Sequence, residues 1–90
     1  MSFPSNTQWS VAPFDNNGTI SSFHPTPWEF GNGTMQAQGL WNGEYQHTPS
    51  SSNTIKCHLN NGDMFEVIFV TTTRFIATKN GGLYRFGKLI

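Results

Sequence analysis

The side chains that could support catalysis are few in this sequence of 90 residues. Cys57 and His58 are an adjacent nucleophile and base, but in an alternating strand pattern their side chains point to opposite faces and cannot pair. Glu29 and Glu44 are the most plausible carboxylate pair. Glycoside hydrolysis needs two acids about 5–9 Å apart across a deep cleft, which so short a chain seldom builds. The sequence therefore predicts a protein that is not an enzyme.

The sequence gives little indication of metal or cofactor binding. The three histidines, His24, His47 and His58, are scattered, and the single cysteine cannot make a zinc knuckle. The alternation around Cys57 indicates a buried thiol that faces the core. Gly31-Asn32-Gly33 lacks the lysine and the strand-to-helix context of a phosphate-binding loop. We expect no metal site and no cofactor.

Aromatic residues beside uncharged polar ones are the remaining chemical signal. A neutral sugar presents aliphatic C–H groups that an aromatic ring can cover and hydroxyls that Asn, Glu or His side chains can bind. Trp28 follows a loop stiffened by Pro25 and Pro27, so it is interpreted as a stacking platform. The candidate hydrogen-bonding residues are Glu29, Asn32, His24, Asn42 and Glu44.

The competing interpretation of the tryptophans is structural. Trp9, Trp28 and Trp41 could instead plug the open ends of a small core, with their indole N–H groups bonded to carbonyl oxygens. The two interpretations make opposite predictions for Trp28→Ala. A stacking residue would lose glycan binding and keep its melting temperature, whereas a core residue would unfold the protein.

Composition excludes some classes of partner. Charged residues make up 11% of the chain against roughly 25% in an ordinary domain, and the net charge is zero. Both values argue against nucleic acid and against an anionic membrane surface. All five acids precede Arg74, whereas four of the five bases lie from Arg74 onward. These charges either neutralise each other within one chain or complement each other between subunits.

Turn chemistry and period-two patterns predict the elements that must position these residues. The five Asn-Gly dipeptides, each the preferred centre of a tight hairpin turn, begin at Asn17, Asn32, Asn42, Asn61 and Asn80. Strands are expected at residues 8–12, 19–23, 34–38, 44–48, 54–59, 64–73, 74–78 and 83–90. Residues 28–30 are expected at the end of a rigid surface loop, and residues 64–73 form a strand covered on both faces. The fold class is all-β, a small antiparallel sandwich or barrel of about 7–9 short strands joined by Asn-Gly hairpin turns.

The chain has room for one domain, residues 1–90, in which residues 1–6 are expected to be a loose arm. Neither a signal peptide nor an apolar stretch of membrane-spanning length is present, which predicts a cytoplasmic protein, released if at all by a non-classical route. Small size and the apolar last strand, residues 83–90, predict a homodimer that pairs through a strand edge.

The WEFGNG and WNGEY stretches at residues 28–33 and 41–45, with the repeated Asn-Gly turns and the low charge, resemble the small β-rich lectins of mushroom fruiting bodies. This resemblance implies a homodimer or higher oligomer that binds galactosyl or related glycans of glycoproteins or glycolipids and uses no cofactor. Multivalency would then compensate for weak individual sites.

Two other functions remain open. Trp41-Asn42-Gly43-Glu44-Tyr45 superficially resembles the opening of avidin- or lipocalin-type barrels, whose aromatic residues line an interior ligand cavity, although eight full-length strands usually need more than 90 residues. The chain could instead be a non-catalytic structural or interaction module.

Overall fold

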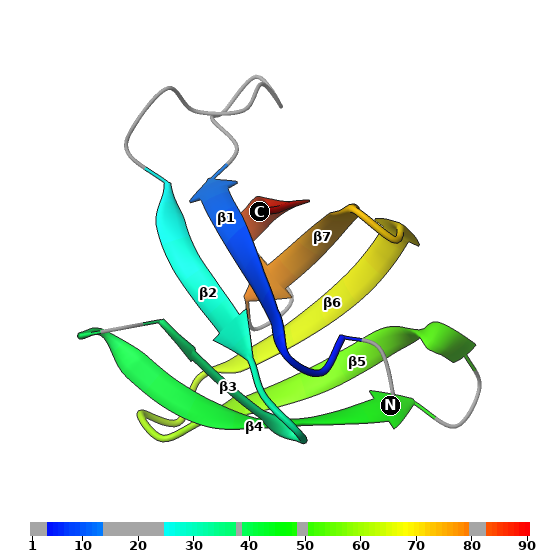
Figure 1. Cartoon of the computed structure of the whole chain (residues 1–90). Coiled ribbons are helices and arrows are strands. Elements are labelled where there is room, and N and C mark those ends of the chain that lie inside the picture. Colours follow the sequence, from blue (N-terminus) through cyan, green and yellow to red (C-terminus); the bar gives the residue numbers. More distant parts are fainter. Residues whose placement is uncertain (1–3, 14–24, 38, 49–50, 80–82) are drawn as a thin grey trace.

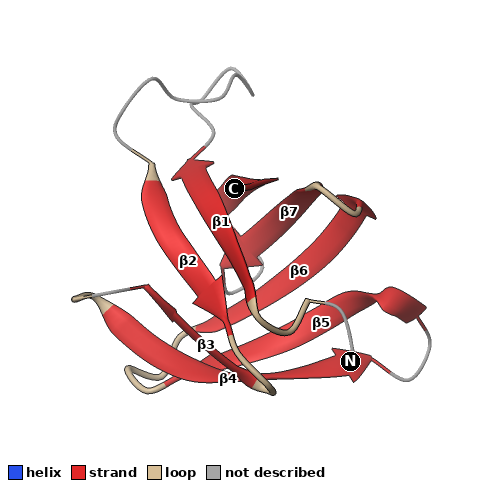
Figure 2. Ribbon diagram, viewed as in Figure 1, coloured by secondary structure: helices blue, strands red, loops and turns tan. Residues whose placement is uncertain are grey.

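The computed structural model describes residues 4–13, 25–37, 39–48, 51–79 and 83–90, and these form eight antiparallel strands without a helix. The strands follow each other around a closed barrel in chain order, which confirms the predicted small all-β fold (Figures 1 and 2). Their bounds are β1 Thr7–Pro13, β2 Thr26–Phe30, β3 Thr34–Ala37, β4 Trp41–Thr48, β5 Ser51–Leu59, β6 Met64–Thr71, β7 Arg74–Lys79 and β8 Leu83–Leu89. None of the described residues belongs to a helix with the length and hydropathy needed to cross a bilayer.

Closure of the barrel removes the edge that the sequence suggested for dimerisation. β8 pairs with β7, and it also pairs with β1 through a register that sets Trp9 opposite Leu89. The last strand therefore has neighbours on both sides, and the predicted strand-edge dimer is wrong in its premise.

The period-two pattern of β6 is present as predicted. Phe65, Val67 and Phe69 point inward and are at most 5% exposed. The other face is not covered: Ile68 is 42% exposed and Val70 is 62% exposed. The expectation of a strand covered on both faces is therefore wrong, because a single layer of sheet encloses the whole core and leaves its outer face to solvent.

Aromatic rings fill the interior of the barrel. The ring centroid of Phe75 lies 4.9 Å from that of Trp9 and 5.6 Å from that of Trp28, and Trp28 lies 5.0 Å from Phe65. Gly87 makes this packing possible, since a Cβ at that position would overlap the Phe75 ring. Side chains of the described residues thus occupy the axis of the barrel, which argues against an avidin-like interior ligand site.

The Asn-Gly dipeptides have two different structural roles. Asn32-Gly33 and Asn61-Gly62 lie in turns as predicted, with Gly φ angles of 80° and 93°. Asn42-Gly43 instead lies inside β4, and the preceding turn contains Gly39 at φ 79°. Gly43 is needed because a Cβ there would overlap the backbone of β5. The dipeptides at 17 and 80 and the expected strand 19–23 fall outside the described residues.

The N-terminal segment is more ordered than a loose arm. Pro4 and Ser5 are buried, and the hydroxyl groups of Ser5 and Tyr45 are 2.9 Å apart in a hydrogen bond. The Thr7 hydroxyl donates to the Pro4 carbonyl. The prediction of a loose arm is therefore wrong for residues 4–6, because these contacts hold the segment against one end of the barrel.

Candidate functional site

Trp28 is part of the core and presents no face to solvent. It lies in the middle of β2, opposite Trp9 on β1 and Ala37 on β3, and its side chain is 2% exposed. The strand begins at Thr26, so the alternation of strand residues turns Trp28 and Phe30 inward. The interpretation of Trp28 as a stacking platform is therefore wrong, as is the expected surface loop at residues 28–30.

The other two indoles do not replace it. Trp9 is fully buried, and its Nε1 donates a 2.8 Å hydrogen bond to the Thr7 hydroxyl. Trp41 is half-buried and packs edge-on against Trp28, with ring centroids 5.1 Å apart. Both tryptophans follow the structural interpretation, in which indoles complete the core.

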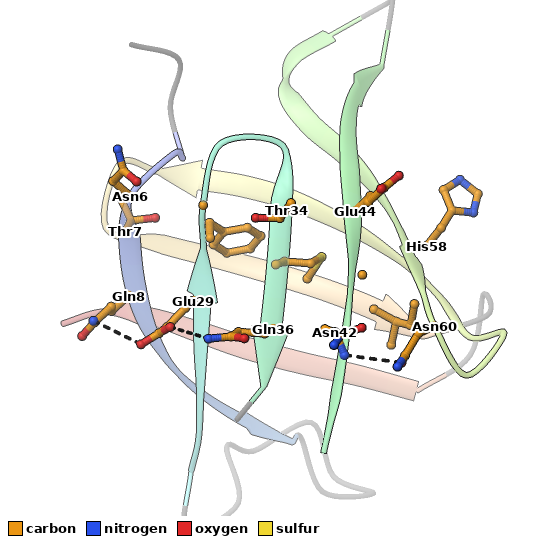
Figure 3. A pocket seen from close by; sticks show the side chains of 15 residues that line it. Asn6, Thr7, Gln8, Glu29, Thr34, Gln36, Asn42, Glu44, His58 and Asn60 are labelled. Atoms are coloured by element: carbon orange, nitrogen blue, oxygen red, sulfur yellow. Dashed lines mark hydrogen bonds between the residues drawn. The ribbon is translucent and has the colours of Figure 1, made fainter. Parts of the chain in front are cut away.

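A polar depression lies on the outer surface of β1 to β5 (Figure 3). Its volume is about 850 Å³, which is within the usual range for ligand-binding pockets. One wall is a row of outward-facing amide and carboxylate side chains, one from each of β1 to β4 and one from the residue that follows β5. We call it the amide row, and it consists of Gln8, Glu29, Gln36, Asn42 and Asn60.

Hydrogen bonds fix the amide row. The Glu29 carboxylate accepts one bond at each oxygen, from Gln8 Nε2 at 3.3 Å and from Gln36 Nε2 at 2.7 Å. At the other end of the row, the Asn42 backbone N–H donates to Asn60 Oδ1 at 3.4 Å, and the Asn60 N–H donates to the Asn42 carbonyl at 2.8 Å. Figure 3 shows these side chains in line across the strands.

A second row forms the opposite wall. Thr34, Glu44 and His58 are cross-strand partners on β3, β4 and β5, and all three are exposed. They are displaced by two residues along the strands from the amide row, and this spacing leaves a groove of about 7 Å between the walls. The floor between the walls is formed by the strand positions that lie between the two rows, and these include Gly43. Because Gly43 has no side chain, β4 can lie close to β5 there.

The charges of the depression are one-sided. Glu29 and Glu44 are the carboxylates among its lining residues, His58 contributes an imidazole, and the lining includes neither lysine nor arginine. A negatively charged ligand would meet two carboxylates without a fixed cation to compensate. Uncharged groups that both donate and accept hydrogen bonds suit these walls better.

Three of the six predicted site residues meet in this depression. Glu29, Asn42 and Glu44 line it, whereas Trp28 lies beneath it in the core. Asn32 is exposed on the β2–β3 turn and is outside the lining. His24 falls outside the described residues.

Sequence reasoning missed most of the polar lining. Asn6 and Thr7, just before and at the start of β1, were missed, and so were five residues on the strand faces: Gln8, Thr34, Gln36, His58 and Asn60. Each of these five occupies an outward position of a strand or its end, so alternation marks it as exposed. Only the pairing register places these residues beside one another, and the register is not readable from local sequence.

No group of three or more His, Cys, Asp and Glu side chains able to hold a metal ion occurs among the described residues. Comparison with family models, curated proteins and solved structures found no match to this chain. Function is therefore inferred from the geometry of the depression.

Proposed function

We propose that this protein is a non-catalytic carbohydrate-binding protein whose depression on β1 to β5 takes an uncharged glycan, such as a galactoside. The hydrogen-bonded amide row carries the proposal. Because Gln8 and Gln36 each direct an amide nitrogen to Glu29, their carbonyl oxygens remain as acceptors for ligand hydroxyls. The side chains are held before the ligand arrives, which lowers the ordering cost of binding.

The spacing of the row supports a sugar rather than a compact ion. Neighbouring strands are about 4.8 Å apart, so the row offers a hydrogen-bonding group at intervals similar to the width of a pyranose ring. Binding would depend on hydrogen bonds without aromatic stacking, since Phe30, the aromatic residue of the lining, is 2% exposed. We therefore expect weak sites.

The charge of the lining supports selectivity against acidic sugars. Glu29 and Glu44 have no lysine or arginine beside them in the depression. Sulfated or sialylated glycans would meet like charge, and their binding would weaken further at low ionic strength.

The test is a titration followed by NMR, with the side-chain amide signals of the row as reporters. Neutral oligosaccharides with terminal galactose or glucose, and a sulfated analogue, are added to the protein. We expect the signals of Gln8, Gln36, Asn42 and Asn60 to shift with a neutral sugar. Loss of hydrogen bonds in Gln36→Ala should weaken binding about 3–10-fold.

Gln46→Ala is the matched control, because Gln46 is an exposed outward-facing glutamine of β4 outside the lining. It should bind like the unmodified protein. The proposal is contradicted if no neutral sugar shifts the row, or if Gln36→Ala and Gln46→Ala bind equally well.

A further inference from the structure

The outer face of β6, β7 and β8 carries an apolar patch on the side of the barrel opposite the depression. The patch consists of Ile68, Val70, Ile76 and Phe86. Its strands surround β7, whereas the depression is centred on β3, and these two strands are four apart in a ring of eight. The two surfaces therefore face away from each other.

Strand register makes the patch continuous. Ile68, Ile76 and Phe86 are direct cross-strand partners on three adjacent strands, and Val70 follows two residues after Ile68 on the same face. Ile68 is 42% exposed and Val70 is 62% exposed. The outer face of a single-layer antiparallel sheet is normally polar, so apolar side chains in contact there mark an interaction surface.

Charged residues stand at opposite corners of this patch. Glu66 lies two residues before Ile68 on β6, and Lys88 lies two residues after Phe86 on β8. Their Cα atoms are two strand spacings apart across the sheet and four residues apart along it, which makes a distance of about 17 Å. This distance is too long for an ion pair within one chain. Arg74, the cross-strand partner of Lys88, adds positive charge at the same corner.

We propose that this patch is a homodimer interface, in which it packs against the same patch of a second copy. The two-fold axis lies in the interface, perpendicular to the line from Glu66 to Lys88. This axis sets Ile76 against Ile76 of the second copy and brings each Glu66 over a Lys88 of the other chain. The strands of the two copies then cross at a steep angle, which is one of the standard ways for sheets to pack.

Charge complementarity favours a second copy over other occupants. A partner must present an apolar centre with a base at one corner and an acid at the opposite corner, and the patch itself has this arrangement. An anionic lipid surface would attract Arg74, Lys88 and Lys56, but it offers no base to Glu66 and no acid of fixed position to Lys88. Lys56, the cross-strand neighbour of Glu66 on β5, lies beyond the apolar patch, so Glu66 would sit between two lysines in the dimer.

Sedimentation equilibrium from about 1 µM to about 1 mM protein tests the proposal. The expected mass at the upper end is twice the 10.1 kDa of the chain. Ile68→Lys should raise the dissociation constant at least ~30-fold, because it places a charge in an apolar contact. Leu40→Lys is the control: Leu40 is 68% exposed on the β3–β4 turn, outside the patch, and this variant should associate like the unmodified protein.

A charge swap tests the orientation of the two copies. Glu66→Lys and Lys88→Glu should each weaken the dimer about 10-fold through like-charge contacts, and the double variant should recover to within about 3-fold of the original. Residues 66 and 88 of one chain are too far apart to contact each other. Recovery of the dimer in the double variant can therefore arise only from contacts between the two chains. A monomer at every concentration, or a dimer unaffected by Ile68→Lys, overturns the proposal. Failure of the double variant to recover overturns the two-fold arrangement.

Discussion

Trp28 determines stability through its contacts with three other rings in the centre of the barrel. Its ring centroid lies 5.0 Å from that of Phe65, 5.1 Å from Trp41 and 5.6 Å from Phe75. Removal of the indole would leave a cavity that rings of this rigidity cannot fill. The residue therefore belongs to the core and does not line the depression.

Trp28→Ala should lower the free energy of unfolding by about 3–5 kcal/mol, the usual cost of truncating a buried large aromatic side chain. Urea denaturation followed by circular dichroism measures this loss. Leu40→Ala, at a side chain that is 68% exposed, should change stability by less than about 0.5 kcal/mol. An unchanged unfolding midpoint in Trp28→Ala would show that the indole is not a core residue.

Cys57 is buried as its alternating sequence context predicts, and the burial has a consequence at alkaline pH. Desolvation raises the pKa of the Cys57 thiol from 9.0 to about 12. Between these two values the unfolded chain has lost a proton that the folded chain keeps. The thiol therefore favours the folded state fully below pH 9, and this contribution decreases as the pH rises toward 12.

We expect the free energy of unfolding to fall between about pH 9 and pH 12, and the fall should be smaller in Cys57→Ala. Urea denaturation of both proteins at several pH values measures the difference between the two slopes. The native thiol should also react with an alkylating reagent far more slowly than the unfolded thiol. Equal slopes in both proteins would contradict the shifted pKa.

Tyr45 links elements that are distant in the sequence. From the interior of β4, its hydroxyl group donates to the Gly31 carbonyl at 2.9 Å and also contacts the Ser5 hydroxyl at 2.9 Å. Gly31 follows β2 directly, and Ser5 precedes β1. One phenol thus fixes the start of the first strand and the β2–β3 turn, both of which border the depression.

Tyr45→Phe should lower the free energy of unfolding by about 1 kcal/mol, since it deletes these bonds without creating a large cavity. Hydrogen exchange should accelerate at the amides of the β2–β3 turn. Thr78→Val is a suitable comparison, because the Thr78 hydroxyl makes a long bond of 3.4 Å at the surface and its loss should cost less. Equal effects of the two substitutions would show that the tyrosine hydroxyl does not tie these elements together.

Local patterns were sufficient to predict several elements and insufficient for others. The alternation of Phe65, Val67 and Phe69 predicted β6, and Asn61-Gly62 predicted the turn before it. Pro25 and Pro27 predict a loop before Trp28, and this prediction is wrong because pairing with β1 accommodates Pro27 within β2. Asn42-Gly43 predicts a turn but lies inside β4, because a glycine required by close strand contact looks the same in sequence as one required by positive φ.

The candidate site was harder to predict than the elements. Outward positions could be assigned from alternation, but the alignment of Gln8, Glu29 and Gln36 depends on the registers of β1 with β2 and of β2 with β3, and residues 28–30 were expected in a loop. Expecting exposed indoles was the main error, since in so small a barrel the largest apolar side chains are needed to fill the interior.

At the scale of the molecule, the depression and the apolar patch lie on opposite sides of the barrel. The depression is polar, with carboxylates and no lysine or arginine, whereas the patch is apolar with acid and base at opposite corners. In the proposed dimer the two depressions would point in opposite directions. Weak sites held in this way could cross-link glycans on two separate surfaces, which raises avidity without tighter individual contacts.

The pairing of β1 with β8 also places the start of the first strand beside the end of the last strand. Trp9 lies opposite Leu89, and the Ile90 N–H donates to the Gln8 carbonyl at 3.0 Å. A short linker could therefore join the ends while the chain is opened at the exposed turn around Asn61 and Gly62. Such a circular permutant would keep every strand beside the same two neighbours, because the ring of strands does not depend on which one the ribosome makes first.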